Sequence, residues 1–124
     1  MRNEIEKVLE TMREDYNRWS MMTRTVHQNV EEFNRAIDIR EEMTENYCKG
    51  LRVEENRRYW KIIGSNGGGS STSVKGFIVK AGDKKFREGD MLKPAGWAAP
   101  ARNFARGNVL DGTGVNNVRW TGIG

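Results

Sequence analysis

The chain has 124 residues, which suffices for one domain with a modest core and leaves little room for a second. Hydrophobic residues make up 36% and charged residues 31%, and no apolar run is long enough for a signal sequence or a membrane span. The single cysteine, Cys48, excludes an intramolecular disulfide. We therefore expect a single domain over residues 1–124 that works in a reducing cytoplasm.

The net charge of +4 is unevenly distributed along the chain. Residues 1–56 contain nine Lys or Arg against thirteen Asp or Glu, a net charge of −4, whereas residues 57–124 contain twelve against four, a net charge of +8. A basic half suits nucleic acid, a free nucleotide or another polyanion, and charge does not distinguish among these partners.

The first fifty residues carry the apolar spacing of amphipathic helices. Asn3 is a suitable N-cap residue, with Glu6 three positions later as in a capping box, and predicts a helix from about residue 4 to about residue 20. Its apolar face consists of Ile5, Val8, Leu9, Met12, Tyr16 and Trp19. Ser20 or Thr23 is suited to cap a second helix, whose apolar stripe continues to Gly50. One long bent helix is the alternative, and we favour two helices.

After Gly50 the pattern changes from helical to extended. Short apolar runs between glycine and aspartate turns predict strands at 57–63, 74–81, 84–87, 108–110 and 118–121, with a polar turn at 51–56. The glycine- and serine-rich stretch Gly64–Ser73 is expected to be a mobile loop that joins two strands. The fold class is therefore α+β: two helices at 1–50, then a small curled antiparallel sheet and a ligand-binding loop at 57–124.

The two helices also raise the question of self-association. Two apolar stripes must be shielded from water by each other, by the sheet or by a second chain. We therefore expect a homodimer or a larger homo-oligomer.

The segment Lys93–Asn108 holds the candidate ligand site. Its two prolines, Pro94 and Pro100, prevent a long helix or a central strand from running through it. We expect Trp97 and Phe104 to anchor the segment by burial.

Two arginines in this segment, Arg102 and Arg106, suggest an anion site. No acidic residue lies between Met91 and Leu110 to neutralise them. If residues 101–106 form a helical turn, the four-residue spacing places both guanidinium groups on one face, as a diphosphate requires. Asn103 and Asn108 lie beside them in the sequence and are further candidate contacts. An aromatic residue, Phe77, Trp97 or Tyr59, is expected to stack on a base.

No catalytic or metal-binding pattern accompanies these arginines. His27 and Cys48 are the whole stock of soft metal ligands, whereas a zinc site needs four ligands, so we predict no metal. No serine lies in a GxSxG-like elbow, and the glycines at 67–69 are not followed by GK[ST]. We expect a binding protein without a cofactor rather than an enzyme.

Three stretches resemble a known family: RRYWKII at 57–63, VKGFIVKAGDKKFREGDMLKPAGWAAPARNFARGN at 74–108 and VRWTGIG at 118–124. They are similar to the phage anti-Thoeris proteins of the first type, which act as sponges for the signal molecule of a bacterial immune system. The most specific part is ARNFARGN, at residues 101–108.

The resemblance implies tight binding of glyco-cyclic ADP-ribose, a cyclic ADP-ribose isomer made by a TIR-domain protein, without chemical change. Thoeris defence would thereby be blocked in the cytoplasm of an infected bacterial host cell. In that family the pocket lies where two subunits meet and uses two arginines four apart and an aromatic residue. These correspond to Arg102, Arg106 and Phe77 here. Some members also form larger assemblies and capture cyclic oligonucleotides at separate sites.

Two other functions fit the residue pattern. The basic half, with its aromatic residues, is typical of a module that binds single-stranded nucleic acid. The acidic helices are compatible with an inhibitor that acts by protein contact. We favour the nucleotide sponge, in which no nucleic acid takes part.

Overall fold

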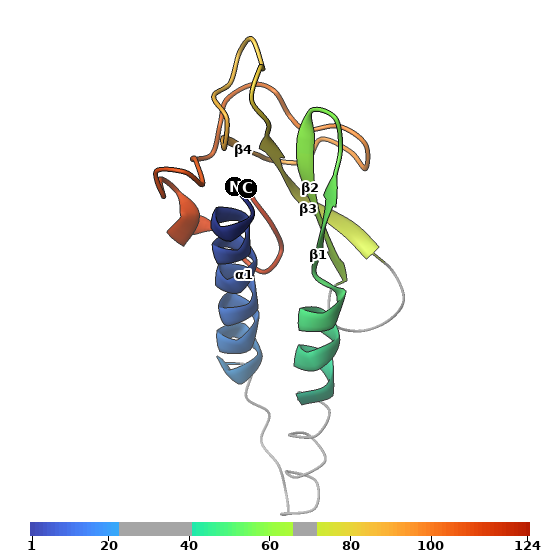
Figure 1. Cartoon of the computed structure of the whole chain (residues 1–124). Coiled ribbons are helices and arrows are strands. Elements are labelled where there is room, and N and C mark those ends of the chain that lie inside the picture. Colours follow the sequence, from blue (N-terminus) through green and yellow to red (C-terminus); the bar gives the residue numbers. More distant parts are fainter. Residues whose placement is uncertain (23–40, 66–71) are drawn as a thin grey trace, which may run out of the picture.

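The computed structural model describes residues 1–22, 41–65 and 72–124 and contains two helices followed by a sheet (Figure 1). Helix α1 (Arg2–Met22) precedes a second helix at 41–50. The strands are β1 (Arg52–Glu55), β2 (Tyr59–Ser65), β3 (Thr72–Val79) and β4 (Met91–Leu92), and a short 3-10 helix, η1 (Val115–Asn117), follows them. The sheet has the order β1-β2-β3-β4, every neighbouring pair is antiparallel, and it does not close into a barrel. The predicted α+β class is confirmed.

Helix α1 begins two residues earlier than predicted. The Ile5 amide donates to the Met1 carbonyl at 3.0 Å, so the first turn already includes Arg2. The Glu4 carboxylate pairs with the N-terminal ammonium group at 3.1 Å. A carboxylate in the first turn also interacts favourably with the positive end of the helix dipole. Asn3 therefore lies within the first turn, and its predicted capping role is wrong.

The predicted apolar face of α1 is confirmed up to Tyr16. Ile5, Val8, Leu9, Met12 and Tyr16 are all buried, whereas Trp19 is 41% exposed. They form one core with residues from the second helix and from the sheet, including Tyr47, Ile62 and Ile78. The stripe is therefore covered within the chain and does not by itself require a second one.

Aromatic contacts join the two helices to the C-terminal segment. The rings of Tyr16 and Tyr47 stack with centroids 4.3 Å apart, and Trp120 packs edge-on against Tyr16 at 5.2 Å. The Tyr47 hydroxyl donates to the Trp120 carbonyl at 2.7 Å, and the Trp120 amide donates to Asp15 Oδ2 at 2.8 Å. Residues more than seventy positions apart thus fix the same corner of the core.

The second helix ends at Gly50, as the sequence predicted. Its expected beginning at Ser20 or Thr23, and the choice between one bent helix and two helices in that stretch, concern 23–40, which lie outside the described residues. The predicted mobility of the glycine-rich loop concerns 66–71, which also lie outside them. The loop does join two paired strands, β2 and β3, as expected.

The start of the sheet differs from the prediction. Residues 52–55 form β1, which pairs with β2 from Arg52↔Ile63 to Glu55↔Trp60, so the predicted polar turn was wrong. The sequence of this strand lacks the alternation of apolar and polar residues because it is an edge strand, whose charged side chains remain in water. The Asn56 amide donates to the Tyr59 carbonyl at 2.8 Å, which closes a turn and delays the start of β2 to Tyr59.

Three of the predicted later strands are absent from the described residues. Residues 84–87 form a bend because the Asp83 carboxylate accepts the amides of Lys85 and Phe86 at 2.8 and 3.0 Å. Residues 108–110 and 118–121 contribute isolated bridges, Asp90↔Asn108 and Arg119↔Gly122 among them, instead of strands. Their place in the sheet is taken by β4, which pairs with β3 through Phe77↔Leu92.

The last residues pack directly on β3. The Ile123 amide donates to the Lys75 carbonyl at 2.8 Å. A Cβ atom at Gly76 would lie 2.5 Å from Ile123 Cδ1, so the glycine makes room for this isoleucine.

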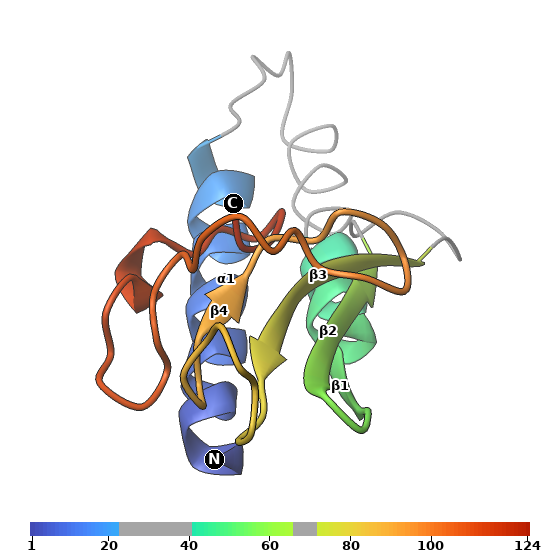
Figure 2. The ribbon, with the colours of Figure 1, turned by 90° about the horizontal axis from the view of Figure 1, so that it is seen from above.

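The alternate residues of β2 and β3 face a second apolar cluster, formed by Tyr59, Phe77, Val79, Phe86 and Leu92. The segment Lys93–Asn108 runs across this side of the sheet (Figure 2). The sheet thus has the helices on one face and the candidate ligand loop on the other.

Candidate functional site

The loop Lys93–Asn108 is held by its own backbone. The Ala101 amide donates to the Lys93 carbonyl and the Arg106 amide to the Met91 carbonyl, both at 2.7 Å. Gly107 has φ +151°, and a Cβ atom there would lie 2.1 Å from the Thr113 carbonyl oxygen. The segment is therefore a closed loop rather than the helical turn considered for 101–106.

Arg102 is fixed by a carboxylate that the sequence did not reveal. Its Nη1 and Nη2 donate to Asp83 Oδ2 and Oδ1 at 3.0 and 2.9 Å, and Nη1 also donates to the Tyr59 hydroxyl at 2.6 Å. The Asp83 side chain is 3% exposed. Hydrogen bonds from Arg102, followed by that from the Lys85 amide, lower the pKa of Asp83 well below its usual range. Arg102 thus has a neutralising partner.

Arg106 has a different environment. Its guanidinium carbon lies 3.8 Å from the ring centroid of Phe104. Its Nε is buried and has no hydrogen-bond partner among the described residues. The two arginines share neither a carboxylate nor a helical face, and their joint role at a ligand stays a prediction.

Phe77 cannot stack on a ligand in this conformation. Its side chain is 0% exposed, and its ring packs edge-on against that of Tyr59 with centroids 5.6 Å apart. The expected role of Phe77 as a base platform is therefore not available in the described chain. Of the three aromatic residues considered, Trp97 is the accessible one, at 51% exposure.

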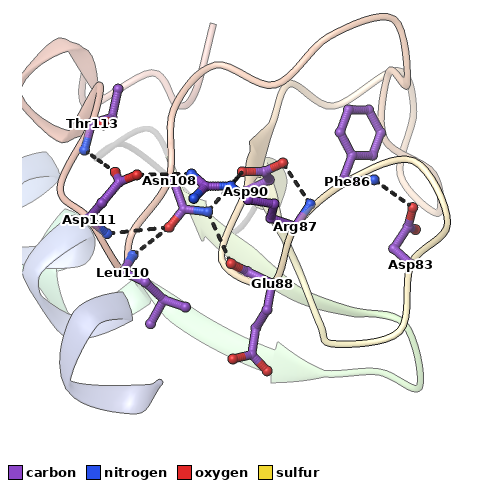
Figure 3. A network of polar contacts seen from close by, with 9 residues as sticks. All are labelled: Asp83, Phe86, Arg87, Glu88, Asp90, Asn108, Leu110, Asp111 and Thr113. Atoms are coloured by element: carbon purple, nitrogen blue, oxygen red, sulfur yellow. Dashed lines mark hydrogen bonds and ion pairs between the residues drawn. The ribbon is translucent and has the colours of Figure 1, made fainter.

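The two candidate asparagines, Asn103 and Asn108, differ in burial and in their hydrogen bonds. Asn108 is 2% exposed, donates to Asp90 Oδ1 at 2.8 Å and to the Glu88 carbonyl at 3.0 Å, and accepts the Leu110 amide at 2.8 Å (Figure 3). These bonds engage its amide in holding two turns together, and the ligand contact expected at Asn108 stays a prediction. Asn103 is exposed, and its Oδ1 accepts the Phe104 amide at 2.9 Å.

The expected anchors of the loop are exposed. Trp97 and Phe104 are 51% and 54% exposed, so their predicted burial was wrong. Backbone hydrogen bonds close the loop instead. Each ring carries a cation on its face, namely the Lys61 ammonium at 3.9 Å and the Arg106 guanidinium at 3.8 Å.

A basic hollow of about 440 Å³ lies at the end of the β2–β3 pair. We call it the basic hollow and define it by its lining: Arg57, Arg58, Lys80, Ala81, Gly82, Asp83, Lys84, Lys85 and Arg102. Antiparallel pairing explains the gathering, since the Lys80 amide donates to the Arg58 carbonyl at 3.0 Å and brings two basic segments side by side. The sequence signal was the pair of doublets Arg57-Arg58 and Lys84-Lys85, whose proximity depends on strand register.

A second hollow of about 450 Å³ adjoins the basic hollow and shares Arg57, Arg58 and Arg102 with it. Its other walls are Asn56, Tyr59 and the loop residues 98–100. The three shared arginines therefore stand between two concave surfaces, and of the predicted site residues Arg102 is the one that lines them.

The described residues contain no group of three or more His, Cys, Asp or Glu side chains that could hold a metal ion; His27 lies outside them. In the same parts of the chain no helix is long and apolar enough to cross a membrane. Cys48 is half-buried, and burial raises the pKa of its thiol, which disfavours the nucleophilic thiolate.

Comparison with known proteins gives one result. A family model described as "Family of unknown function (DUF7717)" matches residues 3–123. No curated protein and no solved structure matches the chain.

Proposed function

The chain belongs to this family of unknown function, and we propose that it is a binding protein that holds a phosphate-bearing nucleotide without changing it. The ligand we propose is a cyclic ADP-ribose isomer, glyco-cyclic ADP-ribose, made by a TIR-domain protein. Sequestering this signal would block Thoeris defence in the host cytoplasm. The ligand's identity rests on the resemblance of 57–124 to the anti-Thoeris proteins.

The observation that carries the binding role is the basic hollow. Six cationic side chains line it against one carboxylate, that of Asp83. That carboxylate already accepts hydrogen bonds from Arg102 and from two backbone amides. Because the charge of Asp83 is compensated, the remaining cations favour an anionic ligand, and guanidinium groups bind phosphate oxygens in pairs.

Asp83 also bears on the choice between binding and catalysis. A general base works best with a pKa near the working pH. The lowered pKa of Asp83 makes its carboxylate a weak proton acceptor, and Arg102 occupies both of its oxygens. These properties support a ligand-holding rather than a proton-transferring role for the hollow.

Heat release tests the proposed function. The protein is incubated with glyco-cyclic ADP-ribose, freed of unbound ligand by gel filtration and denatured by heat, and the released material is identified by mass spectrometry. Intact nucleotide in amounts comparable to the protein is the expected result. Release of a linear product would mean that the protein is an enzyme, and release of nothing would overturn the proposal.

A single-stranded nucleic-acid-binding module is the second candidate, favoured by the exposed rings of Trp97 and Phe104 in the same loop that supplies Arg102 to the basic hollow. This function predicts affinity for oligonucleotides that falls steeply with salt concentration. Fluorescence anisotropy with a labelled oligonucleotide at two salt concentrations separates the two candidates. Tight oligonucleotide binding without capture of the cyclic nucleotide would favour the second.

The proposed assembly is a homodimer or a larger homo-oligomer, in which a second chain completes the ligand site. Its support is the resemblance, since the apolar face of α1 is covered within the chain. Light scattering coupled to gel filtration measures the mass directly. A monomer that still captures the nucleotide would overturn the shared site while leaving the binding role intact.

A further inference from the structure

Lys61, a largely buried lysine beneath the loop Lys93–Asn108, places its ammonium group on the ring of Trp97. Lys61 lies in the middle of β2 and is 4% exposed. Its ammonium nitrogen is 3.9 Å from the ring centroid of Trp97. Within the parts of the chain that the structure describes, no carboxylate or carbonyl oxygen bonds this ammonium group.

This arrangement leaves the positive charge of Lys61 without an anionic partner among the described residues. The ammonium nitrogen of Lys61 is not among the fully buried polar atoms that lack a partner, so water still reaches it and supplies most of its compensation. The face of a tryptophan ring supplies a further part of that compensation, and it does so less well than an anion. Lys61 is therefore suited to accept an anion that can reach it.

The position of Lys61 connects it with the second hollow. It lies two residues after Tyr59, on the same side of β2, which corresponds to about 7 Å along a strand. Tyr59 lines that hollow together with Arg58 and Arg102. The loop residues 98–100 form its opposite wall and directly follow Trp97. A ligand in the hollow would therefore meet Lys61 next, with Trp97 as its cover.

The cover itself is lightly held. Trp97 is 51% exposed and sits at the tip of a turn, in which the amides of Ala95 and Gly96 donate to the Ala99 carbonyl at 3.0 and 3.1 Å. Apart from its two chain neighbours, no described residue has a heavy atom within 4 Å of a Cβ built on Gly96. Moving the ring away from Lys61 breaks no hydrogen bond of the indole among the described residues.

We propose that Lys61 is an anion-binding residue of the ligand site and that Trp97 covers it until a phosphate group takes the place of the ring. This inference rests on the proposed function and specifies the ligand class as one with two linked phosphate groups. One phosphate lies among Arg57, Arg58 and Arg102, and the other reaches Lys61. The displaced indole is then free to stack on a base of the same ligand.

Inorganic pyrophosphate has no nucleobase, so it tests whether the charge of Lys61 by itself contributes to phosphate binding. Affinity is measured by calorimetry for the wild type, Lys61→Met and Lys93→Met. Methionine keeps the length and the burial of the side chain but removes the charge, and Lys93 is an exposed lysine on the same loop. We expect Lys61→Met to weaken pyrophosphate binding by about tenfold or more, as for a lost charged hydrogen bond, and Lys93→Met to change it by less than about twofold.

Tryptophan fluorescence tests the cover. Pyrophosphate does not absorb, so a change in emission reports movement of an indole. We expect a change in the wild type that is lost in Trp97→Phe and in Lys61→Met, with thermal melts showing that both variants are folded.

The outcomes distinguish the two proposals. If the wild type binds both pyrophosphate and glyco-cyclic ADP-ribose and Lys61→Met binds them equally well, the role of Lys61 is refuted and the proposed function stands. If the wild type binds neither, the proposed function fails and this inference fails with it. Loss of binding in Lys61→Met without any fluorescence change in the wild type would refute the cover and retain the anion contact.

Discussion

Arg102 and Asp83 form a two-pronged ion pair, with nitrogen–oxygen distances of 2.9 and 3.0 Å, between the loop Lys93–Asn108 and the turn after β3. The pair has two consequences. It holds the Arg102 guanidinium at the junction of two hollows, and it prevents Asp83 from repelling an incoming anion. Both consequences depend on the carboxylate remaining ionised.

The ion pair predicts a loss of stability in acid. The folded-state pKa of Asp83 lies below its unfolded value, so its contribution is fully present above the unfolded pKa of about 4 and is lost as the pH falls through the folded value. We expect Asp83→Asn to lower the free energy of unfolding at pH 7 by on the order of 2 kcal/mol. Urea titrations from pH 7 to pH 2.5 should show that the free energy of unfolding falls less steeply with pH in the variant than in the wild type. An equally steep fall in both proteins would mean that the Arg102–Asp83 pair does not contribute to stability.

Arg57 offers a test of the hollow that leaves the fold intact. It lines both hollows, is exposed and forms no ion pair within the described residues. We expect Arg57→Ala to weaken nucleotide binding by about fivefold to tenfold without changing the melting temperature. Arg52→Ala, at an exposed arginine of β1 outside both hollows, is the matched control. Equal affinity of the two variants would place the ligand elsewhere.

The two arginines of the loop should differ in their effect on stability. Arg102→Ala removes the partner of a carboxylate that is 3% exposed, and an unpaired buried charge is destabilising. Arg106→Ala leaves no ionised partner behind among the described residues. We expect a lower melting temperature for Arg102→Ala than for Arg106→Ala, measured by differential scanning calorimetry. The double substitution should abolish ligand capture while the circular dichroism signal of the helices is retained.

The aromatic residues should separate into structural and surface classes. Phe77→Ala empties a fully buried position and is expected to lower the free energy of unfolding by about 3–5 kcal/mol. Trp97→Ala, at a residue that is 51% exposed, is expected to change it by less than about 1 kcal/mol. Chemical denaturation of both variants measures the difference. A large effect of Trp97→Ala would restore the view that it is a core anchor.

Asn108 and Asn103 form a similar matched pair. Asn108→Ala removes the donor to the buried Asp90 Oδ1 and the acceptor of the Leu110 amide, while the Arg87 amide still donates to Asp90 Oδ2; we expect it to lower the free energy of unfolding by about 2 kcal/mol. Asn103→Ala removes a bond at an exposed position and should have little effect on stability. Reduced ligand affinity in Asn103→Ala with an unchanged melt would make Asn103 a ligand contact.

Local periodicity predicted the parts of the fold that depend on near neighbours. The burial of Val8 and Met12 follows from helical spacing, and the end of the second helix follows from Gly50. Strand β1 could not be recognised, because charged edge residues such as Glu54 do not alternate with buried ones.

The site required information that sequence spacing does not contain. Asp83 lies nineteen positions from Arg102, and only the folded loop joins them. The absence of acids between Met91 and Leu110 was therefore no measure of charge compensation. Likewise, the exposure of Trp97 follows from backbone closure of the loop, which no composition rule predicts.

The packing of the last residues has a consequence for synthesis on the ribosome. Trp120 bonds both Asp15 and Tyr47, and Ile123 occupies the space that Gly76 leaves open. These contacts cannot form until residues 118–123 have emerged from the exit tunnel. The helices and the sheet should therefore complete their shared core only after residues 118–123 have emerged, and a nascent chain stalled before Val118 should remain sensitive to protease.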